Sequence, residues 1–321
     1  MNTSFDIIGD IHGQAGKLDA LLRLLGYRQR QGAWRHPSRT ALFVGDFIDR
    51  GPEQLRTLDT VRRMIDAGSA QAVMGNHEFN AIAYLLEDPE APGSHLRIRT
   101  DKNRAQHQRF LDEVGEDTPA HREWVDWFLD LPLWLETDSV RVVHACWSPA
   151  HMKVLLSQLA PGNRLTQELM VKASRKGAAE YEAVETLCKG LEVDLPPPVS
   201  YLDADGNRRT RTRTRWWDAS ARHFRSAAMM APEQAKALPQ DPLPAECLLE
   251  YDNVKPLFFG HYWLTGKPSV LTDRICCVDY SAAFDEHPLV AYRFEGEPVL
   301  DAGNLVAIGG QQPTFRSPGM P

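Results

Sequence analysis

The chain has 321 residues, a formal charge of −7 at pH 7 and 43% hydrophobic residues. This length accommodates two domains of about 150 residues, or one larger domain with insertions, and the composition is that of a globular protein. The acidic charge argues against a protein that coats nucleic acid, so stable nucleic-acid binding is not expected. No basic segment precedes an apolar run at the start and no run of about 18 apolar residues occurs, so we expect neither a signal peptide nor a membrane span.

The cysteine content indicates the redox environment. The five cysteines form no even, regularly spaced set; they are Cys146, Cys188, Cys247, Cys276 and Cys277. An odd number of cysteines without a secretory signal favours reduced thiols and a cytoplasmic location. The adjacent pair Cys276 and Cys277 lies in an apolar stretch and is predicted to belong to the core.

The first 90 residues alternate short apolar runs with amphipathic stretches. The predicted elements are a strand at 5–8, a helix at 17–25, a strand at 40–44, a helix at 53–67, a strand at 71–74 and a helix at 77–86. Strands that alternate with helices predict an α/β core.

The middle of the chain has a different character. Residues 88–120 are polar and contain Pro89, Pro92 and Pro119, and no element is predicted there. Predicted elements follow as a helix near 122–129, a strand at 140–143, helices near 149–159 and 165–190, a turn at 203–207, a strand over 208–217, and strands at 256–259, 275–278 and 289–294. We therefore predict a core made of residues 1–147 and 256–308, an inserted segment at 148–255, and a flexible tail at 309–321.

Five predicted strands share one feature at their ends. Each is followed at once by a glycine or another small residue and by a side chain that can bind a metal. The five segments are GDIHG at 9–13, GDFIDRG at 45–51, GNHE at 75–78, HA at 144–145 and GH at 260–261. Ligands of α/β sheets bind beyond the carboxyl ends of the strands, so we expect these segments to meet at one edge.

The side chains of these segments suit a pair of metal ions. They offer two carboxylates, three imidazoles and one amide, from Asp10, His12, Asp46, Asn76, His144 and His261. This set is too large for one tetrahedral zinc and too rich in nitrogen for calcium or magnesium. Two divalent first-row ions that share a carboxylate fit it, and such a pair activates hydroxide for attack on phosphorus. The mixed ligands are compatible with manganese, iron, nickel, cobalt or zinc.

The motifs GDIHG, GDFIDRG and GNHE, in this order and followed by VHA and GH, resemble those of the calcineurin-like metallophosphoesterases. The resemblance is strongest to the serine/threonine phosphoprotein phosphatase branch and to bacterial relatives that include symmetrical diadenosine tetraphosphatases. It covers roughly residues 5–147 and 256–295. It implies a four-layer α/β/β/α sandwich, with the inserted segment as a mainly helical cap that selects the substrate.

The resemblance also implies a reaction and the residues that perform it. The expected enzyme is a phosphatase that hydrolyses phosphomonoesters or phosphoanhydrides through a hydroxide bridging two metals, with manganese as the expected ion. Asp10 and His12 would bind the first metal, Asp46 would bridge, and Asn76, His144 and His261 would bind the second.

The remaining implied roles concern the phosphate and the leaving group. His77 resembles the proton donor to the leaving oxygen, Asp49 the carboxylate that orients it, and Arg50 the phosphate clamp. A second phosphate-binding arginine is common in the family, and Arg213 and Arg215 are the candidates, because alternate residues of a strand share one face.

Two sequence departures and several simpler interpretations accompany this assignment. Cys146 and Tyr262 replace the small residue and the threonine that usually follow the last two motifs, and Trp263 comes next. The other seven histidines are predicted to be solvated, Glu78 to be a carboxylate at a helix start, and the Arg/Thr strand to be a solvated face. Core packing is favoured over nucleobase stacking for Trp216, Trp217 and Trp263.

The function classes left open differ in their substrates. A phosphoprotein, a dinucleoside polyphosphate such as diadenosine tetraphosphate, and a small phosphorylated molecule all fit the motifs. A non-catalytic phosphate-binding regulator is the alternative from another class. Such a protein would usually have lost a ligand or the proton donor, and none is missing here.

Overall fold

The computed structural model describes residues 4–202, 208–230 and 232–309. Its first sheet has the strand order β15–β14–β1–β4–β5. These strands are β1 (Phe5–Ile8), β4 (Thr40–Phe43), β5 (Ala70–Ala72), β14 (Leu289–Phe294) and β15 (Leu305–Ile308). β1, β4 and β5 are parallel, while β14 runs antiparallel to β1 and β15 antiparallel to β14. The predicted α/β alternation is confirmed in this sheet.

A second sheet has the order β13–β12–β7–β6. Its strands are β6 (Trp134–Glu136), β7 (Arg141–Val143), β12 (Leu257–Phe259) and β13 (Ile275–Cys277). β7, β12 and β13 are parallel, and β6 runs antiparallel to β7. A hairpin of β2 (Arg28–Arg30) and β3 (Ala33–Arg35) pairs only within itself among the described residues.

One hydrophobic cluster joins the two sheets. Ile7 and Leu42 of the first sheet meet Val142, Phe258 and Cys276 of the second, and all five are fully buried. The residues before and after them in each strand point to the opposite face of their sheet, because successive side chains of a strand alternate between the two faces. This is why Cys276 and Cys277 belong to different clusters, and both are buried free thiols, as predicted.

Helices α1 (Ala15–Leu25) and α2 (Gln54–Asp66) pack on the first sheet. The apolar face of α1 comes from leucines at helical spacing, and all of them except the exposed Leu24 are buried. Gly26 ends α1 in the left-handed conformation, with φ 97°, and its N–H bonds the Arg23 carbonyl.

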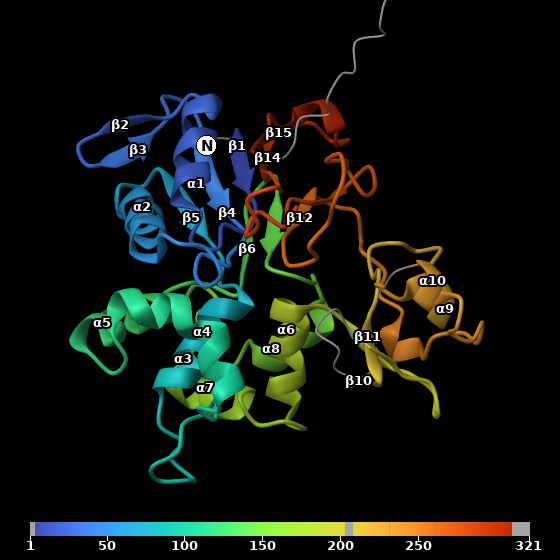
Figure 1. Cartoon of the computed structure of the whole chain (residues 1–321). Coiled ribbons are helices and arrows are strands. Elements are labelled where there is room, and N and C mark those ends of the chain that lie inside the picture. The colour runs from blue at the N-terminus through green and yellow to red at the C-terminus, as the bar shows by residue number, and fades with distance from the viewer. Residues whose placement is uncertain (1–3, 203–207, 231, 310–321) are drawn as a thin grey trace, which may run out of the picture.

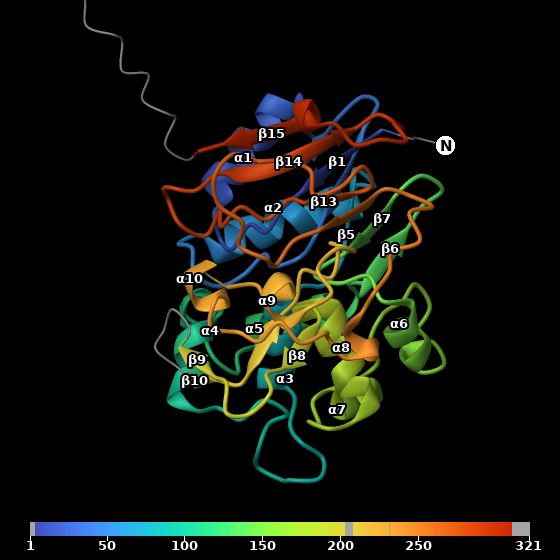
Figure 2. The same ribbon diagram turned by 90° about the vertical axis from the view of Figure 1, so that its right-hand side faces the viewer.

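Most other helices lie on one side of the two sheets (Figures 1 and 2). They are α3 (Asn76–Leu85), α4 (Asp101–Val114), α5 (Pro119–Leu129), α6 (Pro149–Leu155), α7 (Gln167–Ala173) and α8 (Ala179–Lys189). The single helix expected over 165–190 is divided between α7 and α8, and the break contains Gly177 with φ 92°.

Helix α4 was not predicted, because the segment around it is polar and contains prolines. The side-chain oxygen of Thr100 accepts the Asn103 N–H and so begins the helix. Only one narrow face of α4 is buried, formed by His107, Phe110, Leu111 and Val114.

The rest of the inserted segment contains short elements. They are β8 (Glu192–Asp194), β9 (Tyr201–Leu202), β10 (Arg208–Arg209), β11 (Arg211–Arg213), α9 (Phe224–Ala227), α10 (Pro232–Ala235) and η1 (Ala245–Cys247), while η2 (Ala302–Asn304) precedes β15. The strand expected over 208–217 is shorter than predicted, because the Arg215 N–H bonds the Ala227 carbonyl and the chain then turns. The predicted turn at 203–207 and the tail from residue 310 lie outside the described residues.

Within the described part of the chain, no helix combines the length and the apolar character needed to cross a bilayer.

The contact between the sheets yields a stability prediction. Phe258→Ala removes a fully buried ring from the cluster between the sheets, and we expect a loss of about 3–5 kcal/mol in the free energy of unfolding, measured by urea denaturation. Phe284→Ala is the matched control, because Phe284 is 46% exposed. A similar loss for both variants would contradict this view of the core.

Candidate functional site

The parallel strands of both sheets end at a common group of polar side chains. Asp10 follows β1, Asp46 follows β4, Asn76 follows β5, His144 follows β7 and His261 follows β12. Two sets of potential ligand atoms form there, each with all its atoms within 4.8 Å of one another; they are His12, Asp46 and His77, and Asp46, His144 and His261. Asp46 belongs to both sets, so it lies between two positions that could hold a metal.

Distances from one carboxylate oxygen describe this arrangement. Asp46 Oδ2 lies 3.6 Å from His12 Nε2, 3.4 Å from His144 Nε2 and 4.0 Å from His77 Nε2. His144 Nε2 also lies 3.2 Å from Asn76 Oδ1. These oxygen and nitrogen atoms lie close together and have few protons to donate to one another. A cation between them would stabilise such an arrangement.

Backbone carbonyls fix the orientation of two of the imidazoles. His12 Nδ1 lies 2.9 Å from the Ile48 carbonyl and His144 Nδ1 lies 2.7 Å from the Val44 carbonyl. Because a carbonyl can only accept a hydrogen bond, each Nδ1 carries a proton, and each Nε2 is the ring nitrogen that faces the centre.

Several buried atoms at the site lack a hydrogen-bond partner among the described residues. They are Asp10 Oδ1, His12 Nε2, and both ring nitrogens of His261. Leaving such atoms unsatisfied costs about 1–3 kcal/mol each. Since they are carboxylate oxygens and imidazole nitrogens, a divalent first-row ion is the group that fits them.

The loops that carry these residues are tied to each other. Asp10 Oδ2 accepts the His261 N–H at 2.9 Å and so links the two sheets. Any side chain at Gly260 would overlap Asp10 Oδ1, so only glycine fits there. Asp46 Oδ1 accepts the His77 N–H at 3.0 Å, in the first turn of α3. Asp46 therefore caps a helix with one oxygen and faces the centre with the other.

Glu78 holds two of the loops together through hydrogen bonds to their backbone. Its buried carboxylate accepts the N–H groups of Asp46, Phe47 and Gly75 at 2.8–3.0 Å. As predicted, Glu78 is a carboxylate of the first turn of α3. It acts on the site through the backbone.

His77 and Asp49 form a pair that a third residue extends. His77 Nδ1 lies 2.6 Å from Asp49 Oδ2, and His107 Nδ1 lies 2.9 Å from Asp49 Oδ1. The prediction that His107 and His121 are solvated is wrong, because both are buried. The signal that could have found them is the apolar spacing around them, such as Phe110, three residues after His107.

Charges at the site shift the pKa values of its residues. Burial opposes protonation of His77, but Asp46 and the hydrogen bond to Asp49 outweigh it and raise the His77 pKa. Burial lowers the pKa of His12 to about 3. Burial also opposes the charged form of His144, yet Asp46 raises the pKa of His144 to about 10, so a metal ion there would have to displace that proton.

Arg50 lies against an aromatic ring beside this group. Its guanidinium carbon is 3.9 Å from the centroid of the half-buried Trp263 ring. The backbone N–H of Trp263 donates to Asp279 Oδ2 at 2.7 Å. The Asp279 carboxylate is buried, and its charge adds to burial in raising the pKa of Asp10. The sequence analysis missed Asp279, although it too follows a predicted strand.

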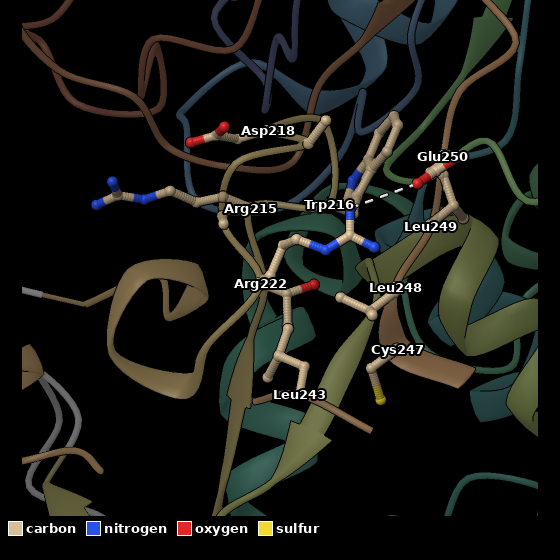
Figure 3. A pocket seen from close by; sticks show the side chains of 12 residues that line it. Arg215, Trp216, Asp218, Arg222, Leu243, Cys247, Leu248, Leu249 and Glu250 are labelled. Atoms are coloured by element: carbon tan, nitrogen blue, oxygen red, sulfur yellow. Dashed lines mark hydrogen bonds and ion pairs between the residues drawn. The ribbon is translucent and has the colours of Figure 1, made fainter. Parts of the chain in front are cut away.

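The two candidate arginines of the inserted segment lie in different surroundings. Burial and next the charge of Arg213 hold the pKa of His261 well below its ordinary range, so Arg213 acts electrostatically on the metal-competent group. Arg215 is exposed and lines a separate pocket with Trp216, Arg222 and other residues of the segment. In Figure 3 its side chain extends away from the Arg222–Glu250 pair.

The tryptophans of the inserted segment belong to the core, as predicted. Trp216 and Trp217 are 4% and 9% exposed and pack against Phe259 and Tyr262. Trp216 Nε1 donates to the Tyr262 hydroxyl at 2.9 Å. Tyr262, where the family usually has threonine, is therefore the place where the inserted segment packs against the second sheet.

Glu78 provides a test of how the loops are held. Glu78→Ala would leave buried N–H groups of two loops unsatisfied, at about 1–3 kcal/mol each, so we expect a loss of at least about 3 kcal/mol in the free energy of unfolding. Glu87→Ala changes an exposed residue just after the same helix and is expected to change the free energy of unfolding by less than about 0.5 kcal/mol. Equal values for the two variants in urea denaturation would refute the role given to Glu78.

Comparisons with known proteins extend these observations. The asymmetrical bis(5'-nucleosyl)-tetraphosphatase PrpE of Halalkalibacterium halodurans is 41% identical over 128 residues, which are 37% of this chain and 52% of that protein. The symmetrical bis(5'-nucleosyl)-tetraphosphatase of Vibrio cholerae is 32% identical over 143 residues, 44% of each chain. The chain thus spans about half the length of the curated relatives it matches.

The fold itself occurs in a solved structure. A protein serine/threonine phosphatase from Saccharomyces cerevisiae, described as similar to human phosphatase PP5, superimposes with a TM-score of 0.51 at 18% identity, over 98% of this chain and 82% of that one. The family model described as calcineurin-like phosphoesterase matches residues 3–195, more than half of the chain. With its GDIHG, GDFIDRG and GNHE motifs inside the matched region, the chain belongs to the calcineurin-like phosphoesterase family.

Proposed function

We propose that this protein is a metal-dependent phosphatase that hydrolyses phosphomonoesters or phosphoanhydrides. The observation that carries the proposal is the buried Asp46 carboxylate, which belongs to two sets of potential metal ligands and lies beside an arginine, a histidine and a second carboxylate. All positions of the family motifs are filled by residues able to act, which argues against a non-catalytic regulator.

The metal ligands are assigned as the sequence predicted. In this proposal Asp10, His12 and Asp46 hold one divalent ion, while Asp46, Asn76, His144 and His261 hold the other. The unsatisfied atoms of Asp10, His12 and His261 support it. Two such ions supply Lewis-acid stabilisation of phosphate charge and activate a water molecule. Manganese is the proposed metal, and iron, nickel, cobalt or zinc would also fit the ligands.

Two arginines bind the phosphate in this proposal. Arg50 presents a planar guanidinium whose position is held by the Trp263 ring, and such a fork matches two phosphate oxygens. Of the two candidates in the inserted segment, we propose Arg213 as the second clamp, because its charge acts on His261. Arg215, which is exposed, has no such contact.

His77 is the proposed proton donor to the leaving oxygen. Its Nδ1 is bonded to Asp49, so its Nε2 is the nitrogen that faces Asp46 and the proposed phosphate position. The raised pKa of His77 favours the protonated form, which is the form a general acid needs.

The substrate proposed first is a nucleotide phosphoanhydride. The basis is that relatives named bis(5'-nucleosyl)-tetraphosphatase match 37% and 44% of this chain. Phosphoproteins and small phosphorylated molecules remain the alternatives. The cytoplasmic location also stays a prediction.

The proposed organisation places substrate selection in the inserted segment. We propose a four-layer α/β/β/α core from residues 1–147 and 256–308, and a cap from residues 148–255. The electrostatic effect of Arg213 on His261 and the hydrogen bond from Trp216 to Tyr262 support a cap seated beside the metal-competent group.

The decisive experiment combines metal content with hydrolysis. The manganese-loaded protein is expected to contain two ions per chain by elemental analysis and to hydrolyse p-nitrophenyl phosphate, with diadenosine tetraphosphate preferred over a phosphopeptide. Asp46→Asn keeps the shape and the helix-capping oxygen but loses the charge, and should lose metal and at least about 100-fold in turnover. The exposed Asp138→Asn is the control. Turnover of Asp46→Asn equal to that of the wild type would contradict the proposal.

The two arginines can be separated by matched substitutions. Arg213→Met should raise KM about 10-fold or more, because loss of a charge-assisted contact to phosphate costs about 1.5–3 kcal/mol. Arg215→Met should leave KM within about twofold. Steady-state kinetics with p-nitrophenyl phosphate measures both, and a larger effect of Arg215→Met would reverse the assignment.

A further inference from the structure

His107 is a buried histidine at the edge of the site that the family motifs do not include. It comes from α4, is 5% exposed, and its Nδ1 lies 2.9 Å from Asp49 Oδ1. Its Nε2 is buried without a hydrogen-bond partner among the described residues. A leucine there would avoid that cost and pack with Tyr84 and Phe110 just as well. The feature that only a histidine-like donor supplies is the bond to Asp49.

That bond completes the hydrogen bonding of the Asp49 carboxylate. Oδ2 lies 2.6 Å from His77 Nδ1, and Oδ1 lies 2.9 Å from His107 Nδ1. An ionised carboxylate can only accept, so both imidazoles carry their proton on Nδ1. One donor on each oxygen fixes the rotation of the carboxylate plane, which a single donor would leave free.

Helix α4 is itself anchored to the loop that carries Asp49. Glu113 of α4 accepts the N–H groups of Gln54 and Leu55 at 2.7 and 2.9 Å, at the start of α2. Gln54 in turn accepts the Asp49 N–H at 2.6 Å. The backbone of Asp49 and the helix that presents His107 therefore belong to one connected set of hydrogen bonds.

The electrostatics agree with this geometry. Burial opposes ionisation of Asp49, but the charge and hydrogen bond of His107, followed by those of His77, outweigh it and hold the Asp49 pKa well below its usual range. His107 thus helps to keep Asp49 an acceptor.

We propose that His107 is a positioning residue: it holds the Asp49 carboxylate so that His77 directs Nε2 into the site. This inference rests on the proposed function, because it concerns the residue named there as the proton donor. For histidines that ligate a metal, losing such an outer hydrogen bond typically costs about 10–100-fold, and we expect an effect of this order for His77. The expected effect is on proton donation to the leaving oxygen, and not on phosphate binding.

Three variants separate this role from mere packing. His107→Leu removes the donor and keeps an apolar side chain. His107→Asn places an amide N–H where Nδ1 was and should restore the bond. His121→Leu is the control, because His121 is also buried and packs on Phe110 and on the His107 ring. Its Nδ1 accepts the Asp117 N–H, and among the described residues it makes no hydrogen bond to Asp49.

The kinetic readout compares two substrates with manganese-loaded enzyme. A poor leaving group such as phenolate needs protonation, while p-nitrophenolate needs little. His107→Leu should lower kcat about 10–100-fold on phenyl phosphate and less than about threefold on p-nitrophenyl phosphate, with KM unchanged. His107→Asn should recover most of the loss, and His121→Leu should leave the ratio of the two rates as in the wild type. Equal losses on both substrates, or no recovery with Asn, would overturn the inference.

A second readout does not need turnover. In metal-free protein, the proton shared by His77 Nδ1 and Asp49 should give a downfield NMR resonance that persists in His107→Asn and is lost or broadened in His107→Leu. An unchanged resonance in His107→Leu overturns the positioning role. If wild-type protein hydrolyses neither substrate, the proposed function fails, and this resonance alone decides whether His107 orients the pair.

Discussion

The buried carboxylate of Asp46 is the constraint on which the rest of this structure depends. An ionised group out of water is costly unless charges and hydrogen bonds compensate it. Burial opposes ionisation of Asp46, yet His144 and His77 outweigh it and hold its pKa well below the ordinary range. Its other oxygen caps α3, and Glu78 holds its backbone. The loops, α3 and both sheets are arranged so that this single charge can stay buried, which is also the condition for holding cations at that point.

The sequence predicted this centre because each of its motifs is a short, continuous pattern of residues. A buried strand, then a glycine, then a polar side chain is a pattern readable within about six residues, and parallel strands bring such ends together. Asp279 obeys the same rule after β13 and was missed only because its strand carried no recognised motif. His107 is different: the surface of α4 is polar, and its contact with Asp49 joins positions 58 residues apart. No local pattern encodes a distance of that kind.

The inserted segment also shows which contacts could not be predicted from the sequence. Helices α6, α7 and α8 were predicted, with one break missed at Gly177, but the short helices α9 and α10 and the relation of the segment to the site were not. Tyr262 was noted only as a departure from the family. In the structure its hydroxyl accepts from Trp216, and a side chain at Gly190 would overlap it. The bulky residue therefore belongs to the packing of the segment on the second sheet. Arg213 comes from the same segment, and its charge adds to burial in lowering the pKa of His261.

These observations divide the site into two kinds of residue. The motif residues lie at strand ends, where backbone geometry alone brings them together. Other residues around the site come from elsewhere: α4 supplies His107, the loop after β12 supplies Trp263, and the inserted segment supplies Arg213. Their positions depend on how these elements pack against the two sheets. The motifs at the strand ends therefore predict the polar centre, but not the residues that surround it.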